Sequence, residues 1–140
     1  MQKISSINAI QVFDSRGVPT ISCKVSLDDG TSASAMVPSG ASTGSKEALE
    51  LRDNDISYHG KSVTKAVNNI NNILSSLVIG KNPNNQKEID ELLISFDDTE
   101  DKSKVGANAI LAISLATAHV AAKANNCLLY TSPSPRDSVV

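Results

Sequence analysis

Apolar and polar residues alternate along two stretches near the start of the chain, residues 4–14 and 20–27. Alternation with a period of two residues is typical of β-strands that bury one face. An Asp-Asp-Gly turn at residues 28–30 follows the second stretch, and residues 31–37 form a third strand-like run. Asp-Gly supplies the positive φ values that tight hairpins need. The pattern therefore predicts a three-stranded antiparallel β-meander.

Residues 38–45 then interrupt this pattern with the sequence Pro-Ser-Gly-Ala-Ser-Thr-Gly-Ser. These residues are small or turn-forming and cannot pack a core, so they predict a loop. Beyond the loop the apolar residues recur at helical spacing. Residues 46–51 predict a short helix and residues 61–77 a longer one. Asn84 or Asn85 is expected to cap a further helix that ends near residue 96.

The last predicted helix, about residues 103–125, is apolar around nearly its whole circumference. Such a helix has to be covered on more than one side, so we expect a partner in addition to the predicted sheet and helices. The polar connection from Asp97 to Lys104 lacks the spacing of a calcium-binding EF-hand and is predicted to be a surface loop. The fold class is therefore α+β, a three-stranded antiparallel meander followed by a helical bundle.

Composition and charge exclude several classes of partner. The chain has 140 residues, a length that suits one domain with its own core, and a net charge of -2. Without a basic excess it is not expected to bind nucleic acid. No stretch predicts a signal peptide or a bilayer span, so no membrane partner is expected and the expected location is cytoplasmic. Cys23 and Cys127 match neither a disulfide framework nor a metal-ligand pair, and Cys23 is expected to be a small buried residue.

The Ser/Gly loop carries the main candidate chemistry. Its glycines let the backbone approach an anion, and its hydroxyl oxygens suit Mg²⁺. The hydroxyls belong to Ser39, Ser42, Thr43 and Ser45. Alone this is a weak signal, because most loops of this composition are flexible connections. A phosphate-binding P-loop is excluded, because the Gly-Lys-Ser sequence at residues 60–62 lacks a glycine at the required upstream spacing.

A charged cluster follows the loop and has a simpler interpretation. It consists of Glu47, Glu50, Arg52 and Asp53. We predict that these side chains form a solvated or ion-paired face of the short helix. His59 and His119 are likewise expected to be structural residues and neither ligands nor bases.

Five segments, in one order and with consistent gaps, resemble the amino-terminal domain of the enolase family. They are Asp14 to Thr20, Val37 to Gly44, Glu47 to Asp53, Gly60 with Lys61, and Lys102 to Leu111. The resemblance covers residues 4–126. Val18 departs from it, since the family usually has Asn there, and Tyr58-His59 replaces a more typical apolar or aromatic pair.

The resemblance implies the capping domain of phosphopyruvate hydratase, the glycolytic carbon–oxygen lyase that dehydrates 2-phosphoglycerate to phosphoenolpyruvate. The lysine base, the acid and the carboxylates of the first Mg²⁺ site belong to a carboxy-terminal barrel that is absent from this chain. No catalytic residue is therefore expected here. Ser42 is expected to bind a second Mg²⁺ through its hydroxyl and carbonyl oxygens, while Gly40 and Ala41 bring backbone against the substrate. The full-length enzyme is expected to be a homodimer.

Residues 127–140 do not continue this pattern. They resemble an in-frame translation of a sequencing adapter, so we expect residues 1–126 to be the enolase domain and residues 127–140 a non-native, disordered tail. Composition alone favours a Pro/Ser-rich linker. The chain by itself is expected to be inactive. Two alternatives stay open: a stand-alone interaction module, which a native terminus after Asn126 would favour, and the capping domain of another enolase-superfamily enzyme.

Overall fold

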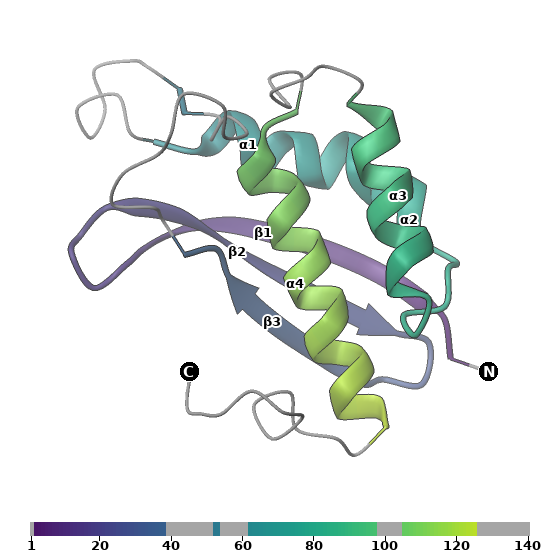
Figure 1. Cartoon of the computed structure of the whole chain (residues 1–140). Helices are drawn as coiled ribbons and strands as arrows, with labels where there is room; N and C mark the ends of the chain where they lie inside the picture. Colours follow the sequence, from purple (N-terminus) through teal and green to yellow (C-terminus); the bar gives the residue numbers. More distant parts are fainter. Residues whose placement is uncertain (1, 39–51, 54–61, 98–104, 126–140) are drawn as a thin grey trace.

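The predicted three-stranded antiparallel meander is confirmed (Figure 1). The computed structural model describes residues 2–38, 52–53, 62–97 and 105–125. Its strands are β1 (Ile4–Phe13), β2 (Pro19–Leu27) and β3 (Ser32–Met36), paired in the order β1-β2-β3. The strand bounds lie within a residue of the predicted ones, because the turn residues and the alternation that set them are local features of the sequence.

The register of the sheet places a row of small buried residues on one face. Ala9 lies opposite Cys23, which lies opposite Ala35, and all three side chains are buried. Cys23 is 0% exposed, and burial raises the pKa of its thiol to about 12. Its role as a small buried residue is thus confirmed. Small side chains in the middle of the sheet leave room for a helix to approach closely.

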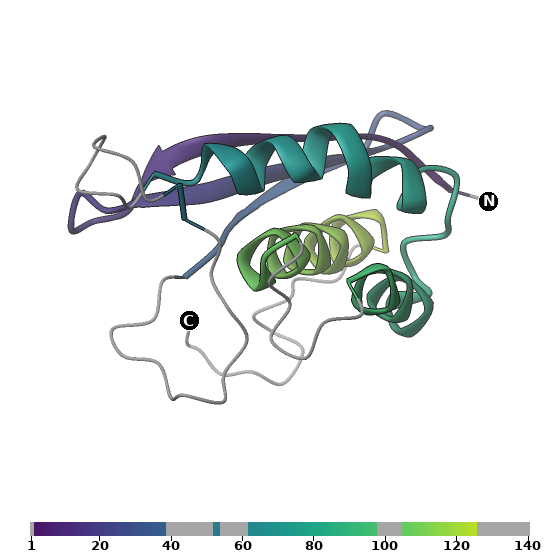
Figure 2. The ribbon, with the colours of Figure 1, turned by 90° about the horizontal axis from the view of Figure 1, so that it is seen from above.

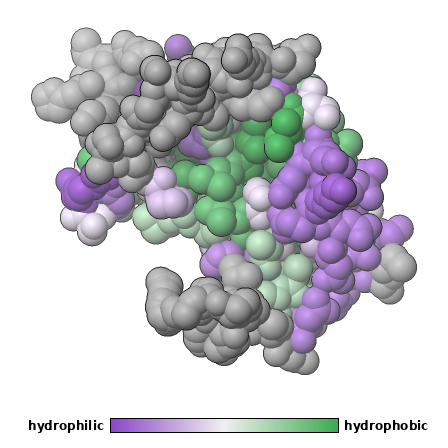
Figure 3. Space-filling view, in the orientation of Figure 1, coloured by the Kyte–Doolittle hydropathy of each residue, from purple (hydrophilic) through white to green (hydrophobic). Residues whose placement is uncertain are grey.

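Helix α4 (Ala107–Ala124) occupies that space and packs on β2 and β3. Its buried residues are Asn108, Ala109, Ala112, Ile113, Ala116, Thr117 and Val120. Figure 2 shows α4 beneath one face of the sheet, with α3 (Gln86–Phe96) beside it. The sheet and the other helices thus cover α4 from more than one side within this chain. Leu111 nevertheless stays 40% exposed, and Figure 3 shows an apolar surface between the segments drawn in grey.

By length and composition alone, α4 would qualify as a membrane span, with a mean hydropathy of 1.3 over 18 residues. The expectation that no stretch of the chain is long and apolar enough was therefore wrong. The helix packs on the sheet and on α3, as the core helix of a globular domain does. Its apolar composition is explained by that packing.

The edge of β1 is covered by a helical segment made of α1 (Thr64–Asn69), η2 (Ile70–Leu74) and α2 (Ser75–Val78). The segment matches the predicted helix at residues 61–77, but a π-helical turn, η2, lies in its middle. From this turn the Asn71 amide pairs with the strand: the Ala9 N–H donates to Oδ1 at 2.8 Å, and Nδ2 donates to the Ala9 carbonyl at 3.0 Å. A strand edge covered in this way is shielded from pairing with another chain.

The start of α3 differs from the prediction that Asn84 or Asn85 caps this helix. Asn85 occupies the N-cap position, but its side chain makes no capping hydrogen bond. The Asn84 side chain instead accepts a hydrogen bond from Asn125 at 2.7 Å. The prediction that an asparagine side chain caps α3 was therefore wrong in its chemistry, although the bounds of the helix were close.

Asp97 also contradicts the sequence-based prediction, which placed it in a surface loop. Its side chain is 0% exposed and accepts a hydrogen bond from the Val105 N–H at 2.8 Å. Burying a carboxylate costs free energy because it loses its hydration, and hydrogen-bond donors in the protein must replace the lost water. Asp97 thus holds together the two ends of the connection 98–104, whose residues lie outside the described ranges.

Truncation of a core residue tests the packing of α4. Ile113→Ala removes a side chain that is 0% exposed, and we expect the free energy of unfolding to fall by about 2–5 kcal/mol. Leu111→Ala, in the same helix but 40% exposed, is the control and should cost about 1 kcal/mol or less. Urea denaturation followed by circular dichroism measures both. Equal losses would contradict the assignment of the buried face.

Candidate functional site

The predicted ligand residues Gly40, Ala41 and Ser42 lie outside the described residues, as does the predicted helix at residues 46–51. The structure does describe the two places where the chain leaves and rejoins the fold around residues 39–51. These two places, with the residues that hold them, are called here the base of the Ser/Gly segment.

The first end of the segment is held by backbone bonds to β2. The Val37 N–H donates to the Ile21 carbonyl at 2.9 Å. The Val37 carbonyl accepts from the Thr20 hydroxyl at 2.7 Å, and Thr20 is buried. The chain therefore stays paired with β2 after β3 itself has ended.

The second end returns to the same place on the sheet. The guanidinium of Arg52 donates through Nη1 to the Pro19 carbonyl at 2.6 Å, and Arg52 is half-buried. Thr20 and Ile21, which hold Val37, are the next two residues of β2. Both ends of the Ser/Gly segment are thus fixed to three consecutive residues at the start of β2.

Asp53 is buried and binds the start of α1. Its carboxylate accepts hydrogen bonds from the Thr64 N–H at 3.2 Å, the Lys65 N–H at 2.9 Å and the Thr64 hydroxyl. The residue at the N-cap position of α1, Val63, has no side chain that could accept these donors. The first N–H groups of a helix lack partners within the helix. Asp53 accepts hydrogen bonds from these groups and so caps α1, although it lies eleven residues before the helix in the sequence.

The hydrogen bonds to the Asp53 carboxylate also favour its ionised form. Burial opposes ionisation, but hydrogen bonds from Thr64, Lys65 and Ser62 together outweigh it, so the pKa of Asp53 lies below its ordinary value. Asp53 contradicts the predicted solvated or ion-paired helix face, because it is buried and accepts backbone groups, whereas Glu47 and Glu50 of that predicted face lie outside the described residues. The Asp53 side chain accepts hydrogen bonds from backbone N–H groups, and the Arg52 side chain donates one to a backbone carbonyl. The spacing of charged residues alone could not reveal these partners.

Gln11 supplies the link from this contact to the sheet. Its Oε1 accepts hydrogen bonds from the Ser62 hydroxyl and from the Val63 N–H, each at 2.8 Å. The Asp53 N–H in turn donates to the Ser62 carbonyl at 2.8 Å. One residue of β1 and one residue of the returning chain therefore hold the same short stretch before α1. Sequence reasoning missed Gln11, because a polar residue in an alternating strand gives no sign of its partner.

The turn between β1 and β2 lies directly before the start of β2, to which both ends of the Ser/Gly segment are fixed. The Asp14 carboxylate accepts from the Arg16 N–H at 2.9 Å and the Val18 N–H at 3.0 Å. The Arg16 guanidinium also lies 3.1 Å from Asp14, an exposed pair of the kind that adds little stability. Val18 enters this arrangement through its backbone, so the hydrogen bonds of the turn do not depend on its side chain.

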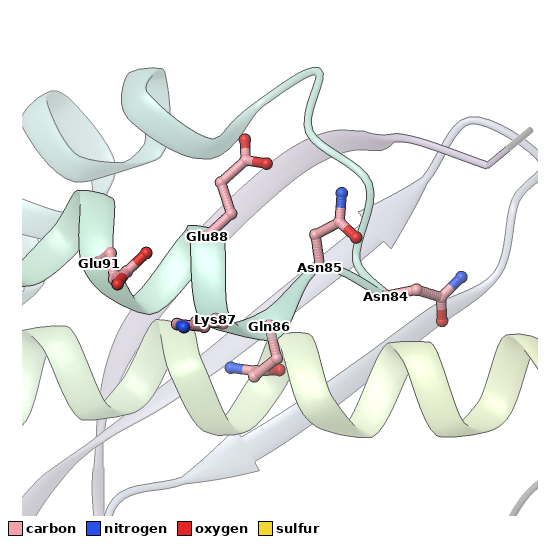
Figure 4. Close-up of a pocket in the computed structure, with 6 residues that line it drawn as sticks. All are labelled: Asn84, Asn85, Gln86, Lys87, Glu88 and Glu91. Carbon is pink, nitrogen blue, oxygen red and sulfur yellow. The ribbon is translucent and has the colours of Figure 1, made fainter.

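The described residues offer no rival site of clear chemistry. Within them, no three His, Cys, Asp or Glu side chains come together as a metal site. An open polar depression lies at the start of α3, lined by the residues labelled in Figure 4 (Asn84 to Glu88, and Glu91). It lies toward the Ile4 end of β1, where Ile4 pairs with Lys81, whereas Gln11 and the base of the Ser/Gly segment lie toward the other end.

The fold defines an α+β domain in which an antiparallel meander is covered by helices on one face and along one edge. Residues 4–132 match the family model described as the enolase N-terminal domain. The chain belongs to the enolase family. The match reaches into the predicted tail as far as residue 132, and the tail boundary at residue 126 stays a prediction.

Similar proteins carry the same family name. The chain is 55% identical over 128 residues to the enolase of Mycoplasmoides gallisepticum, covering 91% of this chain and 27% of that protein. It is 54% identical over 129 residues to the enolase of Mycoplasma genitalium, covering 91% and 28%. For the enolase of Desulfotalea psychrophila the identity is 53% over 128 residues, covering 91% and 30%. The chain spans less than a third of the length of these relatives.

Acid unfolding tests the ionised state of Asp53. Its pKa is lowered from 3.8, so the stability that the carboxylate contributes is present above that value and is lost as the pH falls through the lowered pKa. Asp53→Asn cannot titrate. We expect the melting temperature of the unsubstituted chain to exceed that of the variant at neutral pH, and the difference to shrink between about pH 5 and pH 2. Thermal melts across this range measure it, and a constant difference would contradict the proposed state.

Proposed function

We propose that this chain is the amino-terminal part of an enzyme that dehydrates 2-phosphoglycerate to phosphoenolpyruvate. The observation that carries the proposal is the family match over residues 4–132, together with relatives at 50 to 55% identity that are named enolase. Because the chain spans less than a third of those relatives, the activity is proposed for the longer protein. The lysine base and the acid are expected in the remainder, so no proton transfer is assigned to residues of this chain.

The contribution of this chain is the Ser/Gly segment, and its donors are chemically suited to Mg²⁺. Ser42 would hold the ion through its hydroxyl and carbonyl oxygens, which are hard ligands of the kind that Mg²⁺ prefers. When bound, the ion supplies stabilisation of negative charge that develops on the substrate. Gly40 and Ala41 would bind the substrate through their backbone, since neither carries a side chain that keeps a ligand at a distance.

The proposal extends to the setting of the longer protein. We propose a cytoplasmic homodimer that acts on its small-molecule substrate and binds neither nucleic acid nor a membrane. The net charge of -2 supports the absence of a nucleic-acid partner. Sedimentation of the longer protein would test the dimer, and the sequence of the genomic locus beyond codon 126 would test the boundary of the tail.

Activity can be tested by supplying the missing length. Residues 1–126 are joined to the remainder of the Mycoplasmoides gallisepticum enolase, and formation of phosphoenolpyruvate is followed by its ultraviolet absorbance. We expect magnesium-dependent turnover by this chimera and none by the 140-residue chain alone. Ser42→Ala should lower turnover roughly 100-fold or more if the residue binds the ion.

Ser34→Ala is the matched control, because Ser34 is an exposed serine in the middle of β3. It should leave turnover unchanged. Turnover by the chain alone, or equal turnover by the Ser42 variant and the unsubstituted chimera, would contradict the proposal.

A further inference from the structure

The helical segment made of α1, η2 and α2 runs along β1 and is bound to it at both ends (Figure 2). Before the helices, the Val63 N–H donates to the Gln11 side chain at 2.8 Å. After them, the Ile4 N–H donates to the Lys81 carbonyl at 2.9 Å, and the Ile4 carbonyl accepts from the Gly80 N–H at 2.7 Å. The winding of the segment must therefore place both of its ends on the strand at once.

The π-helical turn η2 lies between these two ends. We propose that η2 is a conformational lock: contacts of Asn71 and Ser75 hold it in the wide π winding, and loss of either contact lets the segment tighten into a continuous α-helix. Each residue of an α-helix turns the chain by about 100°, so removing the extra residue of a π-turn rotates α1 relative to α2 by about that angle. One end of the segment would then have to leave β1. All contacts of the lock belong to described residues.

The first contact of the lock is an exchange of donors at Ser75. Its N–H donates to the carbonyl of Ile70, five residues back, as in a π-helix. In an α-helix this N–H would bond to the carbonyl of Asn71, four residues back. The Asn71 carbonyl instead accepts a hydrogen bond from the Ser75 hydroxyl at 3.0 Å. The hydroxyl thus replaces the N–H, and the Asn71 carbonyl keeps a partner in the wide turn.

The second contact ties the turn to the strand. The Asn71 amide accepts a hydrogen bond from the Ala9 N–H at 2.8 Å and donates one to the Ala9 carbonyl at 3.0 Å. Two hydrogen bonds to one residue fix both the rotation of Asn71 about the helix axis and its height along the strand. If the turn tightened, the amide would move away and leave both backbone groups of Ala9 to find other partners.

The spacing of the buried side chains supports the wide winding. Four residues of the segment recur at intervals of four and are each 0% exposed: Ala66, Ile70, Leu74 and Val78. In an α-helix, residues four apart are displaced by about 40° around the axis, so this row would drift by about 120° over its three intervals. A turn with more residues per revolution reduces that drift. The row and the two contacts therefore favour the same winding, and substitutions can separate their contributions.

Release of the lock would reach beyond β1. The Asn69 amide donates to the Val105 carbonyl at 3.1 Å, shortly before α4, and the N–H groups of Thr64 and Lys65 donate to the Asp53 carboxylate. If α2 stays on β1, a rotation of α1 by about 100° carries these donors away from their acceptors. The lock thus couples the edge of β1 to the start of α4 and to Asp53.

Two pairs of identical neighbours supply matched variants. Asn71→Ala and Ser75→Ala each remove one contact of the lock. Asn72→Ala and Ser76→Ala change the adjacent, exposed residue of the same type. The Ser76 hydroxyl also donates to a carbonyl of the turn, that of Ile73, at 2.7 Å, so this control matches the loss of a hydroxyl hydrogen bond.

The experiment measures NMR scalar couplings across hydrogen bonds in the isotope-labelled 140-residue chain. In the unsubstituted chain we expect a coupling from the nitrogen of residue 75 to the carbonyl carbon of Ile70. In Asn71→Ala and Ser75→Ala a coupling to the carbonyl carbon of residue 71 should replace it, as in an α-helix. Both controls should keep the coupling to Ile70. Exchange of the Ala9 amide should also quicken roughly fivefold or more in Asn71→Ala, the factor that one typical hydrogen bond provides.

Ser75→Ala leaves the Asn71 amide intact, so it carries the test if Asn71→Ala does not fold. Retention of the coupling to Ile70 in the folded variants of Asn71 and Ser75 would overturn the proposal and assign the wide turn to the packing of the buried row. Loss of this coupling in the two controls would overturn it as well, because any substitution in the segment would then relax the turn.

Discussion

Burial of α4 against the middle of the sheet is the interaction on which the rest of the structure depends. Cys23 and Ala35 on the sheet face a helix whose buried side includes three alanines, with Ile113 and Val120 as larger members. Small side chains on both surfaces allow close contact, and close contact removes water from apolar area along the whole length of the helix. The other helices then pack where α4 and the sheet leave apolar surface uncovered.

The connections between strands and helices are held by a second kind of interaction, in which a side-chain oxygen accepts hydrogen bonds from backbone N–H groups. Asp14, Asp53 and Asp97 each accept backbone N–H groups across a connection, and the Asn71 amide does the same at the edge of β1. The chemical reason is common to all of them. Backbone donors that leave a strand or begin a helix lose water on folding, and an unpaired donor would cost roughly 1–3 kcal/mol. Carboxylates and amides placed at these points remove that cost and fix the ends of the segments between them.

These two kinds of interaction differ in how far the sequence predicts them. The strands, the helices and the buried role of Cys23 follow from periodicity, which is a local property, and the meander follows from an Asp-Gly turn. The partners of polar residues do not follow from periodicity. Asp53 caps a helix that begins eleven residues later in the sequence, and Asp97 is buried although its neighbours are acidic. Charge spacing placed both on the surface, because it contains no information about which distant backbone groups need an acceptor.

At the candidate site, too, the local sequence pattern says less than the order of the surrounding segments. A run of serine and glycine is compatible with many loops. Only its order among the flanking segments led to the prediction that Ser42 is a metal ligand. One of those segments ends at Asp53, and another is the turn that contains Asp14. In both, the carboxylate of the acidic residue accepts hydrogen bonds from backbone N–H groups. The residues at the two ends of the Ser/Gly segment therefore fix the two places from which this segment extends. For this chain those places are the start of β2 and the start of α1, and they converge on one end of the sheet.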